Sequence, residues 1–292
     1  MIQTLPKKRL DMTSSNFSPK VTLLNYADDR FGHKGKVFKN CQKIMSESAM
    51  KHGFDEVVSW NWEMLASTDF YRANKAYLDR PYHLNGFVFK PHLTLRVLSE
   101  LNEGDILIYY DSGDGSHVFD TSVKPLVEMC VANGGTLIHQ WGDTNQKWTK
   151  RDCFFFMGVD TPEYHQATAM QATWFVLQKN AFTVKLAEEY LHYTLDERIA
   201  SYDNARVCGL PDLPGFVENR GDQSVLSLLA QKYHLKTFRG AGGHDNRVIG
   251  NFMRWYTFRG RCRILFDRAC KLKLRLSRGV MRRLRSKVSH LD

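Results

Sequence analysis

Apolar residues follow two different periods along the first half of the chain. Short β-rich runs bounded by polar residues or Gly are typical of buried strands, whereas apolar residues three and four positions apart are typical of helices. The pattern predicts strands at 21–26, 55–60, 105–110 and 136–139, helices at 37–52, 91–103 and 121–133, and a helical or irregular segment at 61–80. Strands that alternate with helices predict an α/β fold with a mostly parallel sheet flanked by helices.

The second half of the chain gives fewer regular signals. Residues 167–179 fit either a strand or another buried segment, and 182–193 have the spacing of an amphipathic helix. The Pro-rich segment 210–215 predicts an ordered loop without helix or strand, and a further helix follows at 223–233.

Positive charge is concentrated at the C-terminal end. The chain of 292 residues has a net charge of +10, yet residues 247–292 hold 14 Lys and Arg against 2 Asp and Glu. The remaining residues are near neutral, whereas a core that bound nucleic acid along its surface should itself be basic. We therefore predict an N-terminal extension at 1–20, a catalytic domain at 21–246 and a basic helical tail at 247–292.

The targeting and cysteine patterns indicate a cytoplasmic setting. No apolar run approaches the roughly 18–20 residues that span a bilayer, and no apolar segment follows Lys7, Lys8 and Arg9 as a secretory signal requires. The six cysteines are widely spread with no C-x-x-C pair, which favours reduced thiols and argues against a structural zinc site. Phosphate-loop, dinucleotide-binding, nucleophile-elbow and H-E-x-x-H motifs are likewise missing from the sequence.

Two carboxylates follow the strand predicted at 105–110. Asp111 and Asp114 lie beside Gly113 and Gly115, at the carboxyl end of a strand, where open α/β sheets bind ligands. Carboxylates three residues apart among small residues can approach a divalent cation and leave room for a phosphate. The alternative is an Asp/Gly turn that simply ends a core strand.

Several ordered segments together resemble a group of bacterial and viral glycosyltransferases with the GT-A fold. The resemblance spans roughly residues 20–245, and Gly113 stands where the usual Asp-x-Asp metal motif has its second Asp. The segments that carry it are Phe89-Lys90-Pro91, a leucine-rich helix from Leu93 to Leu101, Asp111-Ser112-Gly113-Asp114, Trp148-Thr149-Lys150-Arg151-Asp152, residues 209–216, and the segment from Asp222 to Leu229.

The resemblance implies transfer of a sugar from a nucleotide-diphosphate sugar to a glycan or lipid-linked acceptor, in synthesis of the polysaccharide or lipopolysaccharide type. Asn25 and Tyr26 in the first strand are then expected at the nucleotide, and Lys90 near its phosphates. Mn²⁺ or Mg²⁺ is expected on Asp111, Asp114 and His244. If the reaction inverts the sugar configuration, Asp222 and Glu218 are the candidate bases; a retaining reaction needs no such base.

Two of these residues also have simpler interpretations. Asp222 stands at the start of a predicted helix and fits an N-cap, in which its carboxylate accepts backbone N–H groups. His244 follows the flexible run Gly240-Ala241-Gly242-Gly243 and also fits a polar loop that closes the domain.

The basic tail has its own amphipathic pattern between residues 265 and 288. A narrow apolar stripe surrounded by Lys and Arg favours binding to an anionic membrane surface, and thus a peripheral location on the inner face of a membrane. The alternatives are a helix packed on the catalytic domain, and a non-catalytic nucleic-acid-binding protein that uses the Arg-rich tail. The stripe consists of Leu265, Ala269, Leu272, Leu276, Val280, Leu284 and Val288.

Overall fold

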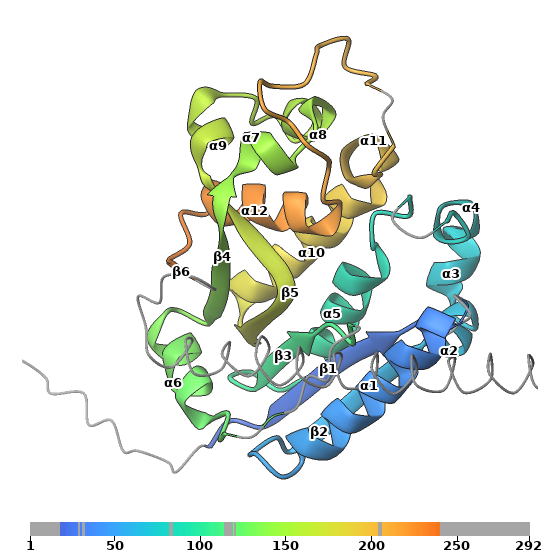
Figure 1. Cartoon of the computed structure of the whole chain (residues 1–292). Coiled ribbons are helices and arrows are strands. Elements are labelled where there is room, and N and C mark those ends of the chain that lie inside the picture. The colour runs from blue at the N-terminus through green and yellow to red at the C-terminus, as the bar shows by residue number, and fades with distance from the viewer. Residues whose placement is uncertain are drawn as a thin grey trace, which may run out of the picture.

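The structure is a computed structural model that describes residues 18–28, 30, 33–81, 84–113, 119, 121–203 and 206–239. In this part of the chain six strands form one sheet in the order β2-β1-β3-β5-β4-β6 (Figure 1). Only β5 runs antiparallel to its neighbours, so the predicted α/β class with a mostly parallel sheet is confirmed. The strands are β1 (Val21–Ala27), β2 (Glu56–Asn61), β3 (Ile106–Tyr110), β4 (Thr136–Thr144), β5 (Thr168–Gln178) and β6 (Thr237–Arg239).

Helices cover both faces of the sheet (Figure 1). The longer ones are α1 (His33–Ala49), α5 (Phe89–Glu100), α6 (Lys124–Ala132), α10 (Ala181–Leu195) and α12 (Asp222–Lys232). The shorter ones are α2 (Trp62–Ala66), α3 (Asp69–Ala73), α4 (Lys75–Leu78), α7 (Asn145–Trp148), α8 (Arg151–Phe156), α9 (Pro162–Gln166) and α11 (Glu197–Ala200).

The central strand β3 explains why the sheet has a core on each side. Successive side chains of a strand point to opposite faces. Ile106, Ile108 and Tyr110 therefore join the apolar cluster that includes residues of α1 and α6. Leu107 and Tyr109 join the cluster on the other face, which includes residues of α5, α10 and α12. Because both faces are covered, all of β3 is buried and its sequence is a continuous apolar run.

Most predicted elements are confirmed, with shifted ends. The helix predicted at 91–103 begins earlier, at Phe89, and ends at Glu100. The strand predicted at 136–139 continues to Thr144, and 167–179 is strand β5. Residues 210–215 form no helix or strand, as predicted. Among the described helices none is long and apolar enough to cross a bilayer. The basic tail lies outside the described residues, as does most of the predicted N-terminal extension.

Candidate active site

A cavity of about 300 Å³ opens at the carboxyl ends of β1 and β3. This is the edge at which open α/β sheets usually bind ligands. Its wall combines aromatic side chains with a few charged ones, which is typical of a small-molecule site. The lining residues are Tyr26, Asp28, Phe38, Asn85, Phe87, Phe89, Lys90, Tyr109, Asp111, Ser112, Gly113, Trp141, Gln171, Ala172, Thr173, Tyr202, Arg220, Asp222 and Gln223.

Asp111 is held in place directly after β3. Its backbone N–H donates to the carbonyl of Thr173 at 2.8 Å, which extends the pairing of β3 with β5 by one residue. Tyr109 and Asp111 are two positions apart and share one side of the strand, so the Tyr109 hydroxyl donates to Asp111 Oδ1 at 2.7 Å. The Asp111 side chain remains 35% exposed, so its carboxylate can still meet a ligand.

Lys90, from the first turn of α5, lies between two carboxylates. Its Nζ is 2.8 Å from Asp222 Oδ2, 3.2 Å from Asp111 Oδ1 and 3.0 Å from the carbonyl oxygen of Ala172. These three acceptors match the three N–H donors of an ammonium group. Burial alone would lower the pKa of Lys90, but the two carboxylates outweigh it and hold the pKa above its ordinary value. Lys90 therefore stays protonated, and its positive charge is balanced by Asp111 and Asp222 within the protein.

Asp222 is the first residue of α12 and does not cap it. The N-cap is Gly221, and the Asp222 carboxylate accepts from Lys90 and, at 3.0 Å, from the Tyr190 hydroxyl. The N-cap interpretation of Asp222 is thus wrong, because the carboxylate turns to the buried ammonium rather than to the helix backbone. Burial raises the pKa of the Asp222 carboxyl, and the charge of Lys90 opposes part of that rise. A raised pKa brings this carboxyl closer to the range useful for proton transfer.

Gly221 makes this entry into α12 possible. Its φ of +54° lies in the left-handed region. A Cβ at this position would lie 2.7 Å from Tyr202 Cε2 and 3.1 Å from the carbonyl oxygens of Ala200 and Gly86. Any side chain here would therefore push apart the segments that carry Tyr202 and Asp222.

The two residues predicted at the nucleotide take opposite sides of β1. Tyr26 lines the cavity and stacks on Phe89 with ring centroids 4.1 Å apart. Asn25 points to the other face, where it is buried and its Nδ2 donates to Ser46 Oγ of α1 at 3.2 Å. Asn25 is not among the lining residues because neighbouring side chains of a strand alternate between faces.

The remaining predicted residues do not meet at the cavity in the described part of the chain. Glu218 is exposed, lies outside the lining and forms an ion pair with Arg220 at 2.7 Å. Asp114 and His244 lie outside the described residues, and no group of three potential metal-ligating side chains occurs within them. Asp111 could supply one ligand of a cation site. Its Oδ1 contacts Tyr109 and Lys90, whereas Oδ2 makes only a long contact of 3.5 Å with Lys90, and the side chain is partly exposed.

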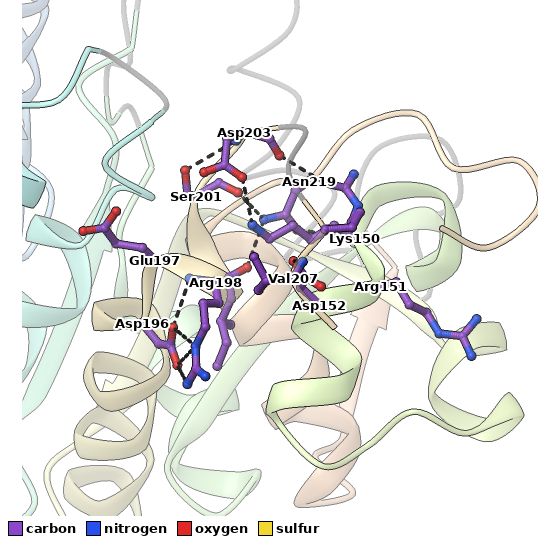
Figure 2. Close-up of polar contacts among 12 residues, drawn as sticks. Lys150, Arg151, Asp152, Asp196, Glu197, Arg198, Ser201, Asp203, Val207 and Asn219 are labelled. Atoms are coloured by element: carbon purple, nitrogen blue, oxygen red, sulfur yellow. Dashed lines mark hydrogen bonds and ion pairs between the residues drawn. The ribbon is translucent and has the colours of Figure 1, made fainter. Parts of the chain in front are cut away.

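The predicted segment 148–152 contacts the chain near residues 201–203 and 219 (Figure 2), next to two residues that line the cavity. The Lys150 backbone N–H donates to Asn219 Oδ1 at 3.2 Å, and Asn219 Nδ2 donates to the carbonyls of Ile199 and Ser201. Lys150 Nζ is 3.5 Å from Asp203 Oδ1, and burial lowers its pKa. These contacts position Tyr202 and Arg220, which lie next to Ser201 and Asn219 in the sequence.

Several lining residues were not predicted from the sequence. Arg220 follows Asn219 in a polar loop that gives no motif, and Trp141 lies in the part of β4 beyond the predicted strand. Gln171 and Gln223 also line the cavity. Two positional signals were available, because Gln223 directly follows Asp222 and Arg220 lies between the predicted residues Glu218 and Asp222.

No protein-family model and no curated protein matches the chain. Among solved structures, the apo form of mouse xyloside xylosyltransferase 1 is similar with a TM-score of 0.41 and 12% sequence identity. That similarity covers 75% of this chain and 84% of the mouse chain, and it is too weak to indicate a function.

Proposed function

We propose that this protein is a metal-dependent glycosyltransferase that moves a hexose from a nucleotide-diphosphate sugar to a glycan or lipid-linked acceptor in polysaccharide synthesis. The observation that carries the proposal is the pairing of Asp111 and Asp222 through Lys90 at one cavity. These residues come from three separate segments of the sequence resemblance. A simple Asp/Gly turn after β3 does not account for this convergence.

The aromatic end of the cavity suits a nucleoside. Tyr26 and Phe89 stack on each other there, and Phe38 from α1 also contributes to the lining. Aromatic faces bind flat heterocycles through stacking, with little loss of side-chain entropy. We assign the base of the donor to this end.

The proposed cation, Mn²⁺ or Mg²⁺, would bind at Asp111, with Asp114 and His244 as the further candidate ligands. When bound, such a cation neutralises the negative charge that develops on the leaving phosphate. Tyr109 and Lys90 fix the orientation of the Asp111 carboxylate. This preorganisation is what a metal ligand requires of its surrounding side chains.

Asp222 is the proposed base for an inverting reaction. Its carboxylate would accept the proton of the acceptor hydroxyl, while Lys90 and Tyr190 hold it in position. Glu218 remains the second candidate, although it points to solvent beside Arg220. A retaining reaction would need neither base, and Asp222 would then orient the donor sugar.

The experiment that tests this function is release of nucleoside diphosphate from UDP-, GDP- and dTDP-linked hexoses by the full chain. We expect turnover with at least one donor in the presence of Mn²⁺ or Mg²⁺, and loss of turnover with EDTA. Asp111→Asn serves as the inactive control. No release from any donor, with candidate acceptors and metal present, would contradict the proposal.

We further propose that the basic tail holds the enzyme peripherally on the inner, cytoplasmic face of a membrane. The support is the apolar stripe at 265–288 within a segment that carries 14 basic residues against 2 acidic ones. An enzyme acting on lipid-linked acceptors gains from such a position because its acceptor is confined to the same surface.

A further inference from the structure

Arg220 occupies an unusual place on the cavity wall. Its guanidinium carbon lies 4.7 Å from the ring centroid of Trp141 and 4.7 Å from that of Trp148. The two indole rings are themselves close, with centroids 4.4 Å apart. A guanidinium on aromatic faces gains cation–π attraction and loses little entropy on binding, because its plane is already fixed.

The ion pair between Arg220 and Glu218 is a weak one. Its partner Glu218 is 46% exposed, and exposed pairs of this kind contribute little to stability. The Nε of Arg220 is buried and has no acceptor within the described residues. Within the described residues the Nε donor is therefore unpaired, and the side chain as a whole is 32% exposed, so part of the guanidinium remains accessible at the cavity wall.

Lys90, the other cation among the described lining residues, has no donor left for a ligand phosphate. All three N–H donors of Lys90 are matched by Asp111, Asp222 and the Ala172 carbonyl, and its side chain is 5% exposed. A ligand phosphate would have to displace a carboxylate from a buried ammonium, which is costly. At Arg220 it would displace only an exposed carboxylate.

We propose that Arg220 binds a phosphate group of the ligand in this cavity, and that Glu218 occupies the guanidinium until that ligand arrives. The inference rests on the proposed function, in which the phosphate belongs either to the donor diphosphate or to a phosphate-bearing acceptor. A planar guanidinium matches phosphate oxygens with two parallel hydrogen bonds, which an ammonium cannot do. Glu218 is then a competitor of the ligand.

The test is calorimetric titration of the full chain and its variants at fixed ionic strength. The probes are UDP and GDP, the matching nucleosides, inorganic pyrophosphate, and glucose 1-phosphate as a phosphate-bearing acceptor model. Arg220→Gln should weaken binding of the phosphate probe by about 10- to 100-fold, the range for a hydrogen bond to a charged group. Glu218→Gln should tighten it by up to about fivefold, because the competing carboxylate is gone.

The opposite signs of these two effects separate binding from a folding defect, because unfolding cannot strengthen affinity. Arg220→Lys keeps the charge but not the planar fork, and it should fall between wild type and Arg220→Gln. Nucleoside affinity should be the same in all three variants. An effect confined to UDP or GDP identifies the donor phosphate, and one confined to glucose 1-phosphate identifies the acceptor phosphate.

Equal affinity of wild type and Arg220→Gln for every phosphate probe would overturn the inference, even if donors are turned over. A Glu218→Gln variant that binds more weakly would overturn the competitor role. A wild-type chain that binds no nucleoside diphosphate with Mn²⁺ or Mg²⁺ present would count against the proposed function instead. Arg220-dependent binding of pyrophosphate would in that case still support the phosphate site.

Discussion

Replacement of Lys90 by Met probes the central feature of the site. Met has a similar length and is apolar, so it preserves much of the packing and removes only the ammonium. Asp222 then loses its nearest positive charge while its side chain is 4% exposed. Asp111 loses the same partner, and the Ala172 carbonyl loses its donor.

The loss in stability should be large. Removal of one partner from a buried ion pair costs about 3–5 kcal/mol, because the other charge remains buried and uncompensated. For a domain of this size each kcal/mol corresponds to a change in melting temperature of about 2–4 °C, so the variant should melt roughly 6–20 °C lower. Exposed Lys43, whose pair with Glu47 spans 3.9 Å, gives the matched control. Lys43→Met should stay within about 0.5 kcal/mol of wild type.

The pH dependence of the loss identifies its cause. Burial raises the pKa of Asp222 and Lys90 lowers it, so the pKa of Asp222 should rise further in Lys90→Met. A folded-state pKa above the unfolded one means that the folded chain takes up a proton first as pH falls. The variant should therefore regain part of its stability below the raised pKa, and Asp222→Asn in the same background should restore part of it at neutral pH. A loss below 1 kcal/mol, or one that is the same from pH 8 to pH 5, would refute the ion-pair reasoning.

Three further predictions concern activity and location. Asp111→Asn should lower transfer by roughly 10²- to 10³-fold with little change in melting temperature, since the amide keeps the packing but lacks the carboxylate charge that would bind the cation. Near-normal turnover with metal present would mean that Asp111 is only a turn residue. In the pH profile of kcat/KM, the midpoint of the acid limb should lie above the ordinary carboxyl pKa of about 4, because burial raises the pKa of Asp222 and the base must be deprotonated. A midpoint at the ordinary value would argue against Asp222 as the base. The full chain should float with anionic liposomes at low salt and be released at high salt, and a truncation at Gly250 that floats equally well would disprove the tail anchor.

The fold was largely predictable because its long elements carry strong periodicity. The apolar run at 105–110 predicted β3 almost to the residue, since a central strand with both faces covered needs no polar positions. By contrast, α7 and α11 span only four residues each and give no periodic signal. Segment 167–179 stayed ambiguous because apolar and polar residues do not alternate strictly along β5, which is buried on both faces through much of its length.

The candidate site was predictable in its members but not in their contacts. Asp111, Asp222 and Lys90 were all named from the sequence, and the structure brings them together. Lys90 and Asp222 are 132 positions apart in the sequence, and no local pattern specifies their pairing. Lys90 was expected at the phosphates; its placement between two carboxylates comes from the packing of α5 against the sheet. Arg220 was missed because its partners Trp141 and Trp148 come from distant segments.

The charges of the cavity wall connect the proposed metal with the proposed role of Arg220. The described lining carries Asp28, Asp111 and Asp222 against Lys90 and Arg220. Asp28 is paired with Arg30 at 2.7 Å, and Lys90 serves two carboxylates at once, so one negative charge between Asp111 and Asp222 is left uncompensated. A diphosphate that entered this cavity without a cation would be repelled by the charge of Asp111. The proposed divalent cation at Asp111 would convert that repulsion into attraction, and Arg220 would attract phosphate without metal. The metal ion and the Arg220 guanidinium would then act at different points of the ligand, and removal of either should weaken binding without abolishing the contribution of the other.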